Sequence, residues 1–358
     1  MMQMEYTTLD KISENLDSKR KPITSSDRVE GKIPYYGASG IVDYVKDYIF
    51  DESLLLVSED GANLLARSTP IAFSVTGKTW INNHAHVLRF SNENLQKFVE
   101  IYLNSISLES YVTGSAQPKL NQKMLNGIPI PVVDDSQIEI IVNSVENLKS
   151  IIEFRKQELA CLDDLIKARF VEMFGSIYDN KYGYNVMTLQ DVCEPIKDGT
   201  HQTPTYTEDT VNGFKFLSSK DVTSGKVDWD HLKYIPEELH NELYKRISPR
   251  KGDILLAKNG TTGVAAIVDR DEVFDIYVSL ALLKPLEMVT AEYLCSAVNS
   301  LETKHQFDHS LKGIGVPNLH LGEIKKTKII VPPIELQKQF ADFVHQVDKS
   351  KVVVASVK

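Results

Sequence analysis

A heptad pattern in the middle of the chain constrains its fold more than any other feature. Between Ile138 and Phe174, apolar residues recur at alternating steps of three and four, and only Arg155 and Arg169 interrupt the apolar seam. This stretch contains no Gly or Pro, and Gly175 stands just beyond it, where helices commonly stop. The pattern predicts one helix over 138–174, with a length on the order of 55 Å.

Such a rod fits either the core of a single α/β domain or a spacer between two domains, and internal repetition favours the spacer. Segments on the two sides of the helix match at an offset of about 180 to 200 residues, far longer than the period of a solenoid. Both halves combine short β-runs, turns and a few helices, so we predict a duplicated α+β domain. The matching pairs are 54–57 with 253–256, 81–88 with 276–283, 95–105 with 290–300, and 128–131 with 329–332.

A second heptad pattern follows the second half. Between Gln337 and Val354 the seam again advances by steps of three and four, and the chain ends at Lys358 after fewer turns than in the first helix. An apolar seam on a lone helix is unfavourable, so we predict that the two helices pack on each other. Because the chain returns through a whole domain between them, we predict an antiparallel pair of coiled-coil helices.

Pairing with a shorter helix leaves one end of the first helix uncovered. We expect this end to bind a protein subunit through four apolar residues, which are Leu159, Leu162, Ile166 and Met173. The predicted organisation is a first domain at 1–137, a central helix at 138–175, a second domain at 176–333 and a short C-terminal helix at 334–358.

Composition restricts the class of protein without identifying it. With 358 residues, of which 42% are hydrophobic and 25% charged, the chain is long enough for two domains with their own cores. Cys161, Cys193 and Cys295 share no metal-ligand spacing and suit a reducing compartment. The N-terminus has no signal-peptide core, and no apolar run approaches the roughly 18 residues of a membrane span. We therefore expect a cytoplasmic protein without membrane contact.

Several motifs, ordered alike in both halves, resemble one protein family. The second half carries Asp-Gly-Thr-His-Gln-Thr-Pro-Thr-Tyr at 198–206, Phe-Leu-Ser-Ser-Lys-Asp-Val at 216–222, Gly-Asp-Ile-Leu-Leu-Ala-Lys-Asn-Gly-Thr-Thr-Gly at 252–263 and Val-Pro-Pro-Ile-Glu-Leu-Gln-Lys-Gln at 331–339. The first half carries counterparts at 36–40, 59–61, 83–84 and 114–120. With the heptad helix between them, these motifs resemble the specificity subunit of type I restriction-modification systems. The first half departs from the family in lacking the Pro-Pro-hydrophobic-Glu run, and the C-terminal helix is shorter than the family's.

The resemblance implies a DNA-recognition subunit that is not itself an enzyme. Each target-recognition domain reads one half of a split site in double-stranded DNA, and the helix pair sets the gap between the halves. Two methyltransferase subunits dock on the helices and methylate adenine, so S-adenosylmethionine is expected in those partners and no cofactor in this chain. Restriction subunits for translocation and cleavage join later.

Reading DNA takes side chains that reach base edges and others that hold phosphates, and polar loops supply both. Asn and Gln suit adenine, whereas Lys suits guanine or phosphate. Turns are rich in such residues whatever their function, so each candidate also has a purely structural reading. The candidates in the first half are Ser39, Asn63, Arg67, Lys78, His84, Gln117 and Lys119. Those in the second half are Thr200, His201, Gln202, Thr203, Lys220, Lys258, Asn259, Thr261, Thr262 and Lys312.

The net charge of −9 runs against DNA binding, since affinity comes largely from neutralised phosphates. Acidic residues are dense on the central helix and its flanks, however, so a basic face on each domain is compatible with an acidic total. We therefore expect the chain alone to bind DNA weakly, with the methyltransferase subunits supplying the remaining contacts.

Several catalytic chemistries lack their motifs. His84 and His86 lie on one face of a predicted strand, but no further ligand is near in sequence, so packing or polar contact is favoured over a metal. The Gly-rich run at 259–263 lacks the Gly-Lys-Ser/Thr of a P-loop, and Val331-Pro-Pro-Ile334 is not an amino-methyltransferase motif. The alternatives are a stand-alone interaction or decoy module derived from the family, and a DNA-modifying enzyme with a degenerate site.

Overall fold

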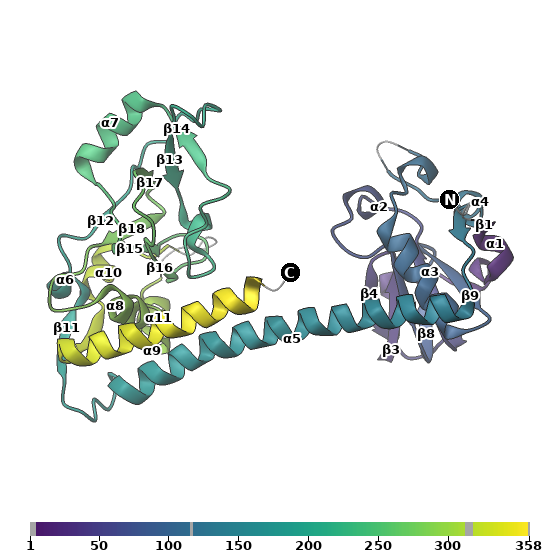
Figure 1. Cartoon of the computed structure of the whole chain (residues 1–358), viewed down its shortest axis with the longest axis horizontal. Helices are drawn as coiled ribbons and strands as arrows, with labels where there is room; N and C mark the ends of the chain where they lie inside the picture. The colour runs from purple at the N-terminus through teal and green to yellow at the C-terminus, as the bar shows by residue number, and fades with distance from the viewer. Residues whose placement is uncertain (1–4, 115–116, 312–317, 357–358) are drawn as a thin grey trace. The chain divides into compact units, whose positions relative to one another are not determined.

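The computed structural model describes residues 5–114, 117–311 and 318–356. The chain divides into two compact units, Met1–Glu153 and Phe154–Lys358, and each mixes helices with small sheets (Figure 1). This confirms the predicted α+β class and the presence of two domains. No helix among the described residues is both long enough and apolar enough to cross a membrane.

The first unit contains two four-stranded sheets and a two-stranded one, in the orders β2-β9-β6-β7, β4-β3-β8-β5 and β1-β10. All pairings are antiparallel except β3 with β8. The strands are β1 Tyr6–Thr8, β2 Ser13–Asn15, β3 Glu30–Gly37, β4 Gly40–Val45, β5 Phe50–Asp51, β6 Leu54–Ser58, β7 Ala72–Val75, β8 Lys78–Ile81, β9 Ala85–Phe90 and β10 Pro129–Pro131. The helices are α1 Leu9–Ile12, α2 Asn63–Ala66, α3 Glu93–Ser105 and α4 Gln122–Asn126, with 3-10 turns at Asp17–Lys19, Ser25–Asp27 and Glu109–Tyr111.

The second unit repeats this topology. Its sheets have the orders β12-β18-β15-β16, β14-β13-β17 and β11-β19, and the parallel pairing of β13 with β17 corresponds to that of β3 with β8. The strands are β11 Asn185–Thr188, β12 Lys197–Asp198, β13 Phe214–Leu217, β14 Lys233–Ile235, β15 Ile254–Ala257, β16 Ala265–Ile267, β17 Phe274–Ile276, β18 Leu280–Leu283 and β19 Lys328–Val331. The helices are α6 Leu189–Val192, α7 Glu237–Arg246, α8 Ala291–Val298, α9 Leu301–Ser310 and α10 Leu321–Lys326, with a 3-10 turn at Ser219–Val222.

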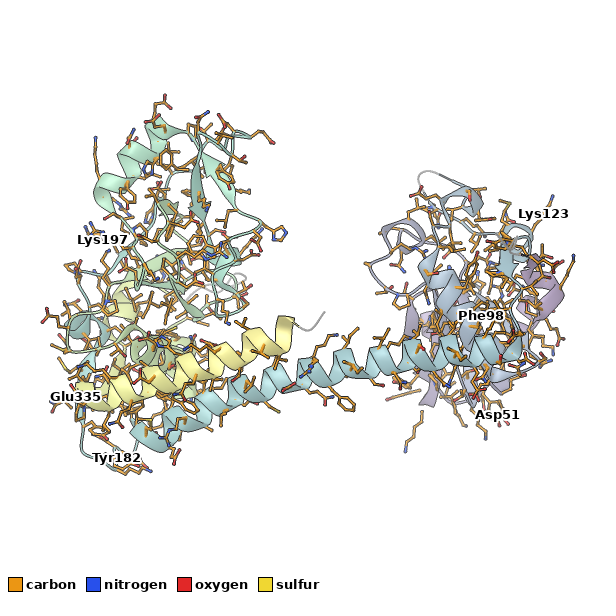
Figure 2. All side chains as sticks on the ribbon, in the orientation of Figure 1. Asp51, Phe98, Lys123, Tyr182, Lys197 and Glu335 are labelled. Atoms are coloured by element: carbon orange, nitrogen blue, oxygen red, sulfur yellow. The ribbon has the colours of Figure 1, made fainter. Side chains whose placement is uncertain are left out.

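The central strand of each unit separates two apolar clusters. In β6 every residue is buried, and alternate side chains enter different clusters: Leu55 and Val57 pack with α3, and Leu54 and Leu56 pack on the opposite face. Strand β15 divides its residues between two clusters in the same way. Phe98 of α3 fills part of the first of these cores (Figure 2). Burial on both faces explains why these strands read as unbroken apolar runs.

Helix α5 spans Asp135–Phe174, 40 residues, and confirms the long central helix. It begins three residues before the predicted start because the Asp134 carboxylate accepts the Gln137 amide at 2.9 Å and so caps the first turn. It ends at the predicted stop, where Gly175 has φ +73°. Its first turns pack Ile138 and Val142 into the core of the first unit.

Helix α11 spans Ile334–Ser356 and lies beside the last turns of α5 within the second unit (Figure 1). Phe340, near its start, packs edge-on against Phe174 at 5.4 Å between ring centroids. Further along, the Lys351 ammonium lies 2.6 Å from the carboxylate of Asp163, which precedes Phe174 in α5. The contacts therefore run in opposite directions along the two helices, and the predicted antiparallel pair is confirmed.

The antiparallel pairing covers the segment that was expected to bind a partner. Ile166 and Met173 pack against the core of the second unit, and Leu159 and Leu162 are half-buried. The prediction therefore needs correction for Ile166 and Met173, because α11 begins beside the end of α5, whereas a subunit contact at Leu159 and Leu162 stays a prediction. Apolar side chains earlier in α5 are exposed instead, with exposed fractions of 58%, 51% and 56% at Leu148, Ile151 and Ile152.

Candidate DNA interface

In the second unit, five loop segments meet where β15 ends, and we call this surface the second edge (residues 198–203, 218–220, 258–263, 277–279 and 318–319). Backbone hydrogen bonds hold it together: the Lys258 amide donates to Ser279 and the Leu319 amide donates to Lys258. The Thr200 amide donates to Ile276, and the Ser219 amide donates to the Ser279 hydroxyl at 2.9 Å. The motif segments that the sequence singles out around 200, 219 and 260 are therefore neighbours in space.

Asp198 organises the charges of the second edge. Its carboxylate lies 2.6 Å from the ammonium of Lys258, 3.3 Å from His201 and 3.7 Å from Arg246. Burial raises the pKa of the Asp198 carboxyl, but the hydrogen bonds and charges of Lys258 and His201 outweigh it, so the pKa lies below its usual value. Arg246, at the end of α7, also donates to the backbone carbonyls of Asp198 and Gly199. One carboxylate thus gathers Lys258, Arg246 and the His201 ring around this loop.

The first unit has the corresponding surface, which we call the first edge (residues 38–39, 58–61, 84–86 and 117–120). The Glu59 amide donates to His84, the Leu120 amide donates to Glu59, and the Gly61 amide donates to Pro118. The Ser58 hydroxyl donates to the Ala38 carbonyl at 2.5 Å and so joins the β3–β4 turn to this surface.

Acidic and basic side chains also pair on the first edge. Glu59 accepts from Arg20 at 2.5 Å and lies 3.2 Å from the Lys119 ammonium, while the exposed His84 ring lies 2.9 Å from Asp60. Burial raises the pKa of the Glu59 carboxyl, but the hydrogen bond from Arg20 and the charge of His86 outweigh it, so the pKa is lowered. Both acids are therefore compensated by cations that face the same surface.

The edges collect most of the candidate residues. The candidates on the first edge are Ser39, His84, Gln117 and Lys119, and all four are exposed. Those on the second edge that are exposed are His201, Gln202, Thr203, Lys220 and Thr261, with Asn259 and Thr262 half-buried and Thr200 buried.

Four candidates stand apart from the exposed sets. Lys258 is on the second edge but only 5% exposed, with its ammonium bound to Asp198. In the first unit, the Asn63 amide group bonds the Thr69 backbone, and the Arg67 guanidinium donates to Ile106 at the end of α3. Lys78 belongs to β8, outside the first edge, and its ammonium lies 4.6 Å from the centroid of the Tyr48 ring. A structural role accounts for these contacts. Lys312 lies outside the described residues.

Sequence reasoning missed four residues that shape the edges, which are Arg20, His86, Asp198 as the charge centre, and Arg246. Asp198 is the first residue of the motif at 198–206, so the sequence did indicate that its position matters. Arg20 and Arg246 lie far along the chain from the groups they contact, 39 residues for Arg20 and Glu59 and 48 for Arg246 and Asp198. No local pattern indicates such a pair.

Comparison with known proteins agrees with the duplicated architecture. The family described as Type I restriction modification DNA specificity domain matches residues 1–163 and again 181–353. A Haemophilus influenzae protein assigned as a type I restriction enzyme specificity subunit is 28% identical over 368 residues, covering 99% of this chain and 89% of that protein. The MjaVIII specificity subunit of Methanocaldococcus jannaschii is 23% identical, with coverage of 93% and 83%.

Solved structures share the fold. The type I restriction-modification S subunit from M. genitalium superposes with a TM-score of 0.56 at 14% identity, covering 99% of this chain and 91% of that one. A chain from a structural study of complex assembly in a type I restriction-modification system gives a TM-score of 0.58 at 14% identity, with coverage of 99% and 92%. The two matched regions take in nearly all of the sequence, and this chain belongs to the family of type I restriction-modification DNA specificity proteins.

Proposed function

We propose that this chain is the DNA sequence-recognition subunit of a type I restriction-modification complex, and that each unit reads one half of a bipartite target through its edge. Family membership supports the role. The observation that carries the division of labour is the duplicated edge, in which Glu59 and Lys258 make the same two backbone bonds to neighbouring loops. Because both units have an edge with the same backbone hydrogen bonds, each unit can contact one half-site of the same DNA duplex.

The exposed side chains on the edges have the chemistry of base readout. Gln202 on the second edge and Gln117 on the first are exposed amides, which pair with the two polar groups of adenine in the major groove. Lys119 and Lys220 are exposed cations that suit phosphate or guanine. Lys258 is assigned to holding the loop through Asp198 rather than to touching DNA.

The test is methylome sequencing of cells that express the chain with its cognate modification subunit. We expect a split methylation motif, with Gln117→Ala relaxing one half and Gln202→Ala relaxing only the other. Lys304→Ala, an exposed position away from both edges, serves as the control and should leave the motif unchanged. A motif that changes in both halves with either variant, or in neither, contradicts the division.

We assign weak DNA affinity to the chain alone. Its net charge is −9, and cations on both edges are already engaged by Glu59, Asp60 and Asp198. Few phosphates are therefore neutralised by this chain, and the methyltransferase subunits supply the remaining contacts. Binding measured across a salt series with and without those subunits tests this, and tight specific binding by the chain alone at physiological salt would contradict it.

We assign the spacer role to α5. Inserting one heptad after Phe154 in α5, about 10 Å of helix, is expected to lengthen the gap in the recognised sequence by about 3 base pairs at roughly 3.4 Å each. Methylome sequencing reads the gap directly. An unchanged gap would show that another part of the complex sets the spacing.

The exposed stripe of Leu148, Ile151 and Ile152 is the docking surface that we assign to the methyltransferase subunits. Each of these side chains exposes more than half of its surface, which is unusual for a helix seam without a partner. Those subunits, and not this chain, bind S-adenosylmethionine and methylate adenine, and restriction subunits join the same complex. Ile151→Asp is expected to abolish co-purification with the modification subunit. Lys149→Asp changes an exposed residue that is not part of the stripe and is expected to leave co-purification intact. Equal loss or equal retention in both variants would contradict the assignment.

A further inference from the structure

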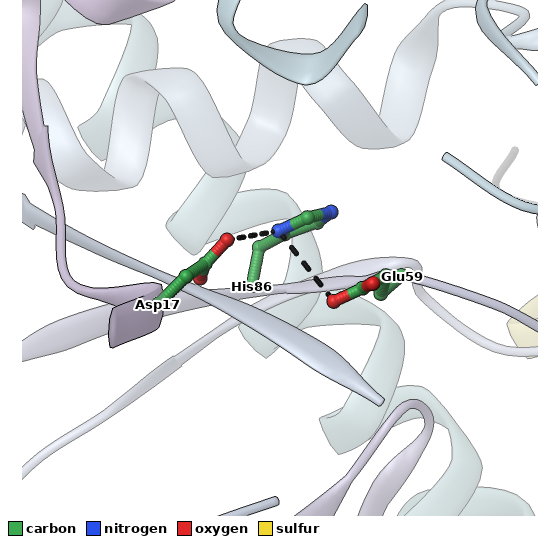
Figure 3. A group of neighbouring side chains, drawn as sticks. All are labelled: Asp17, Glu59 and His86. Atoms are coloured by element: carbon green, nitrogen blue, oxygen red, sulfur yellow. Dashed lines mark hydrogen bonds and ion pairs between the residues drawn. The ribbon is translucent and has the colours of Figure 1, made fainter. Parts of the chain in front are cut away.

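His86 is a buried histidine at the first edge that lies outside the predicted set of DNA contacts. It belongs to β9 opposite Val57 of β6, and only 1% of its surface is exposed. Figure 3 shows its ring between the carboxylates of Asp17 and Glu59. A buried polar ring must form hydrogen bonds to be tolerated, so its partners define what it does.

Both ring nitrogens of His86 face hydrogen-bond acceptors. Nδ1 lies 2.5 Å from the Asp17 carboxylate, and Nε2 lies 2.7 Å from the backbone carbonyl of Leu120. Asp17 also accepts from the Val87 amide at 2.8 Å. Burial raises the pKa of the Asp17 carboxyl, but the hydrogen bond and charge of His86 outweigh it, so the pKa lies below its usual value and the group is ionised. A neutral imidazole has one N–H, so the two bonds together require the imidazolium.

The surrounding charges are compatible with that cation. Asp17 and Glu59 face it with two negative charges, and Arg20 and Lys119 are the other cations of the cluster, each paired with Glu59. Farther out, His84 pairs with Asp60.

Asp17, Glu59 and His86 also have potential ligand atoms within 4.8 Å of one another, which is the spacing of a metal site. Hydrogen bonding and charge balance account for the cluster without a metal, because Arg20 and Lys119 compensate Glu59 and the Nδ1 that faces the carboxylates lies 2.5 Å from Asp17.

The Leu120 carbonyl belongs to the segment that carries Gln117 and Lys119. This segment is held by three backbone contacts, in which Leu120 donates to Glu59, Gly61 donates to Pro118, and Lys119 exchanges bonds with Thr113. His86 is the buried side chain that ties the segment to the sheet behind it. The two exposed side chains proposed to contact DNA are therefore positioned through His86.

We propose that His86, as an imidazolium bonded to both Asp17 and Leu120, is a positioning residue for recognition of the first half-site. This rests on the proposed function. A side chain that makes only one of the two bonds should loosen the segment 117–120, so amide protection of the segment and affinity for the first half-site should fall by about fivefold, which corresponds to one hydrogen bond.

The second unit is an internal control, because no histidine stands at the position equivalent to His86. Asp198 pairs with Ala281 of β18 in the strand register, where Asp17 faces His86, and its carboxylate binds Lys258 instead. The Leu319 amide still donates to Lys258, as the Leu120 amide donates to Glu59. Substituting His86 is therefore expected to leave the order of the second edge unchanged.

The test measures protection and protonation in the full chain without DNA, in buffer containing EDTA. Hydrogen exchange of His86→Gln, expressed as protection factors relative to the wild type, is expected to show about fivefold lower protection in peptides covering 117–120 and unchanged protection in peptides covering 318–321. Nitrogen NMR of ¹⁵N-histidine-labelled wild type is expected to show both ring nitrogens of His86 protonated. His84→Gln changes an exposed neighbouring ring and should leave protection of 117–120 unchanged.

The outcomes separate this inference from the proposed function. A neutral His86 ring in the folded wild type, or unchanged protection of 117–120 in His86→Gln, overturns the inference whatever the chain binds. If His86→Gln fails to fold, the wild-type NMR spectrum alone decides. DNA binding by the assembled complex is measured next, with targets scrambled in one half-site. A loss of affinity in His86→Gln that is confined to the first half-site supports the inference, and equal losses for both halves contradict it.

Discussion

In both units, the residue that follows the central strand donates its amide to one neighbouring loop and accepts an amide from another. Glu59 donates to His84 and accepts from Leu120, and Lys258 donates to Ser279 and accepts from Leu319. The side chains at this shared position have opposite charges. Each finds its counter-charge at or after the second strand of its unit: Arg20, after β2, pairs with Glu59, and Asp198, at the end of β12, pairs with Lys258.

The comparison teaches that the backbone hydrogen bonds at this position are the same in both units, whereas the charge of its side chain matches the oppositely charged residue beside it. The pair in the second unit is slightly the more deeply buried, since the Lys258 side chain is 7% exposed and that of Arg20, its counterpart on Glu59, is 13% exposed. Glu59 also has a second cation, Lys119, whose side chain is 52% exposed. A substitution that unbalances the charges should therefore lower the free energy of unfolding more at the second edge than at the first. The following experiments test that ranking.

The largest effect is expected from Lys258→Glu, which places a second carboxylate against Asp198 in a buried site. We expect the second unit to lose about 4–5 kcal/mol of unfolding free energy, the range for breaking a buried ion pair. Denaturant unfolding followed by hydrogen exchange measures each unit separately. Glu59→Lys is the matched change in the first unit and should cost less, because Arg20 keeps Asp17 and the Ala85 carbonyl as partners and Lys119 can turn toward solvent. Equal losses would show that burial does not set the difference.

Neutral substitutions sharpen the same ranking. Lys258→Met keeps the length of the side chain but leaves Asp198 with only the more distant His201 and Arg246, at an expected cost of about 3 kcal/mol. Glu59→Gln retains a hydrogen-bond acceptor for Arg20 and should cost about 1 kcal/mol. Chemical denaturation of both variants gives the comparison, with Lys220→Met, an exposed lysine, as the reference. A larger loss for Glu59→Gln would reverse the ranking.

Acid should weaken both units. The pKa values of Asp17 and Asp198 lie below the usual 3.8 in the folded chain, so their stabilisation is present above that pH and is lost as the pH falls through the lowered values. Glu59 acts in the same direction from its usual 4.5. Thermal unfolding between about pH 2 and 7 should show falling stability at the acid end. An Asp198→Asn variant should lose part of this dependence in the second unit alone.

The smallest effects on stability are expected at the exposed histidines. The side chains of His84 and His201 are 51% and 68% exposed where they pair with Asp60 and Asp198. Alanine at either position should change the unfolding free energy by less than about 1 kcal/mol, as for exposed ion pairs. The same variants should weaken recognition of different half-sites, which binding to DNA scrambled in one half will report. A stability loss above that level would mean that these pairs hold the fold.

Periodicity predicted the helices well and their contacts poorly. The helix expected at 138–174 is α5, extended by an aspartate cap, and the antiparallel partner is α11. The heptad seam did not include Phe170 and Phe174, which are the buried aromatic residues where α5 meets the second unit. A helix that packs on a globular core as well as on another helix buries a wider stripe than a coiled-coil seam.

The candidate interface was predicted in part. The motif loops converge on the two edges, as the resemblance implied, but individual roles differ from expectation. Lys258 was a candidate because of its charge, but its ammonium is paired with Asp198. The Arg67 guanidinium donates to the backbone at the end of α3. Residue type alone does not distinguish a lysine that meets solvent from one that balances a buried carboxylate.

The sequence by itself determined the duplication, the central strands, the long helix with its stop at Gly175, and the segments from which the edges are made. These follow from periodicity and local backbone preference, which act over a few residues. Tertiary structure alone decided which charges pair and which stay free. Asp17 and His86 are 69 residues apart in sequence and 2.5 Å apart in space, and folding brings such groups together wherever burial makes an unpaired charge too costly.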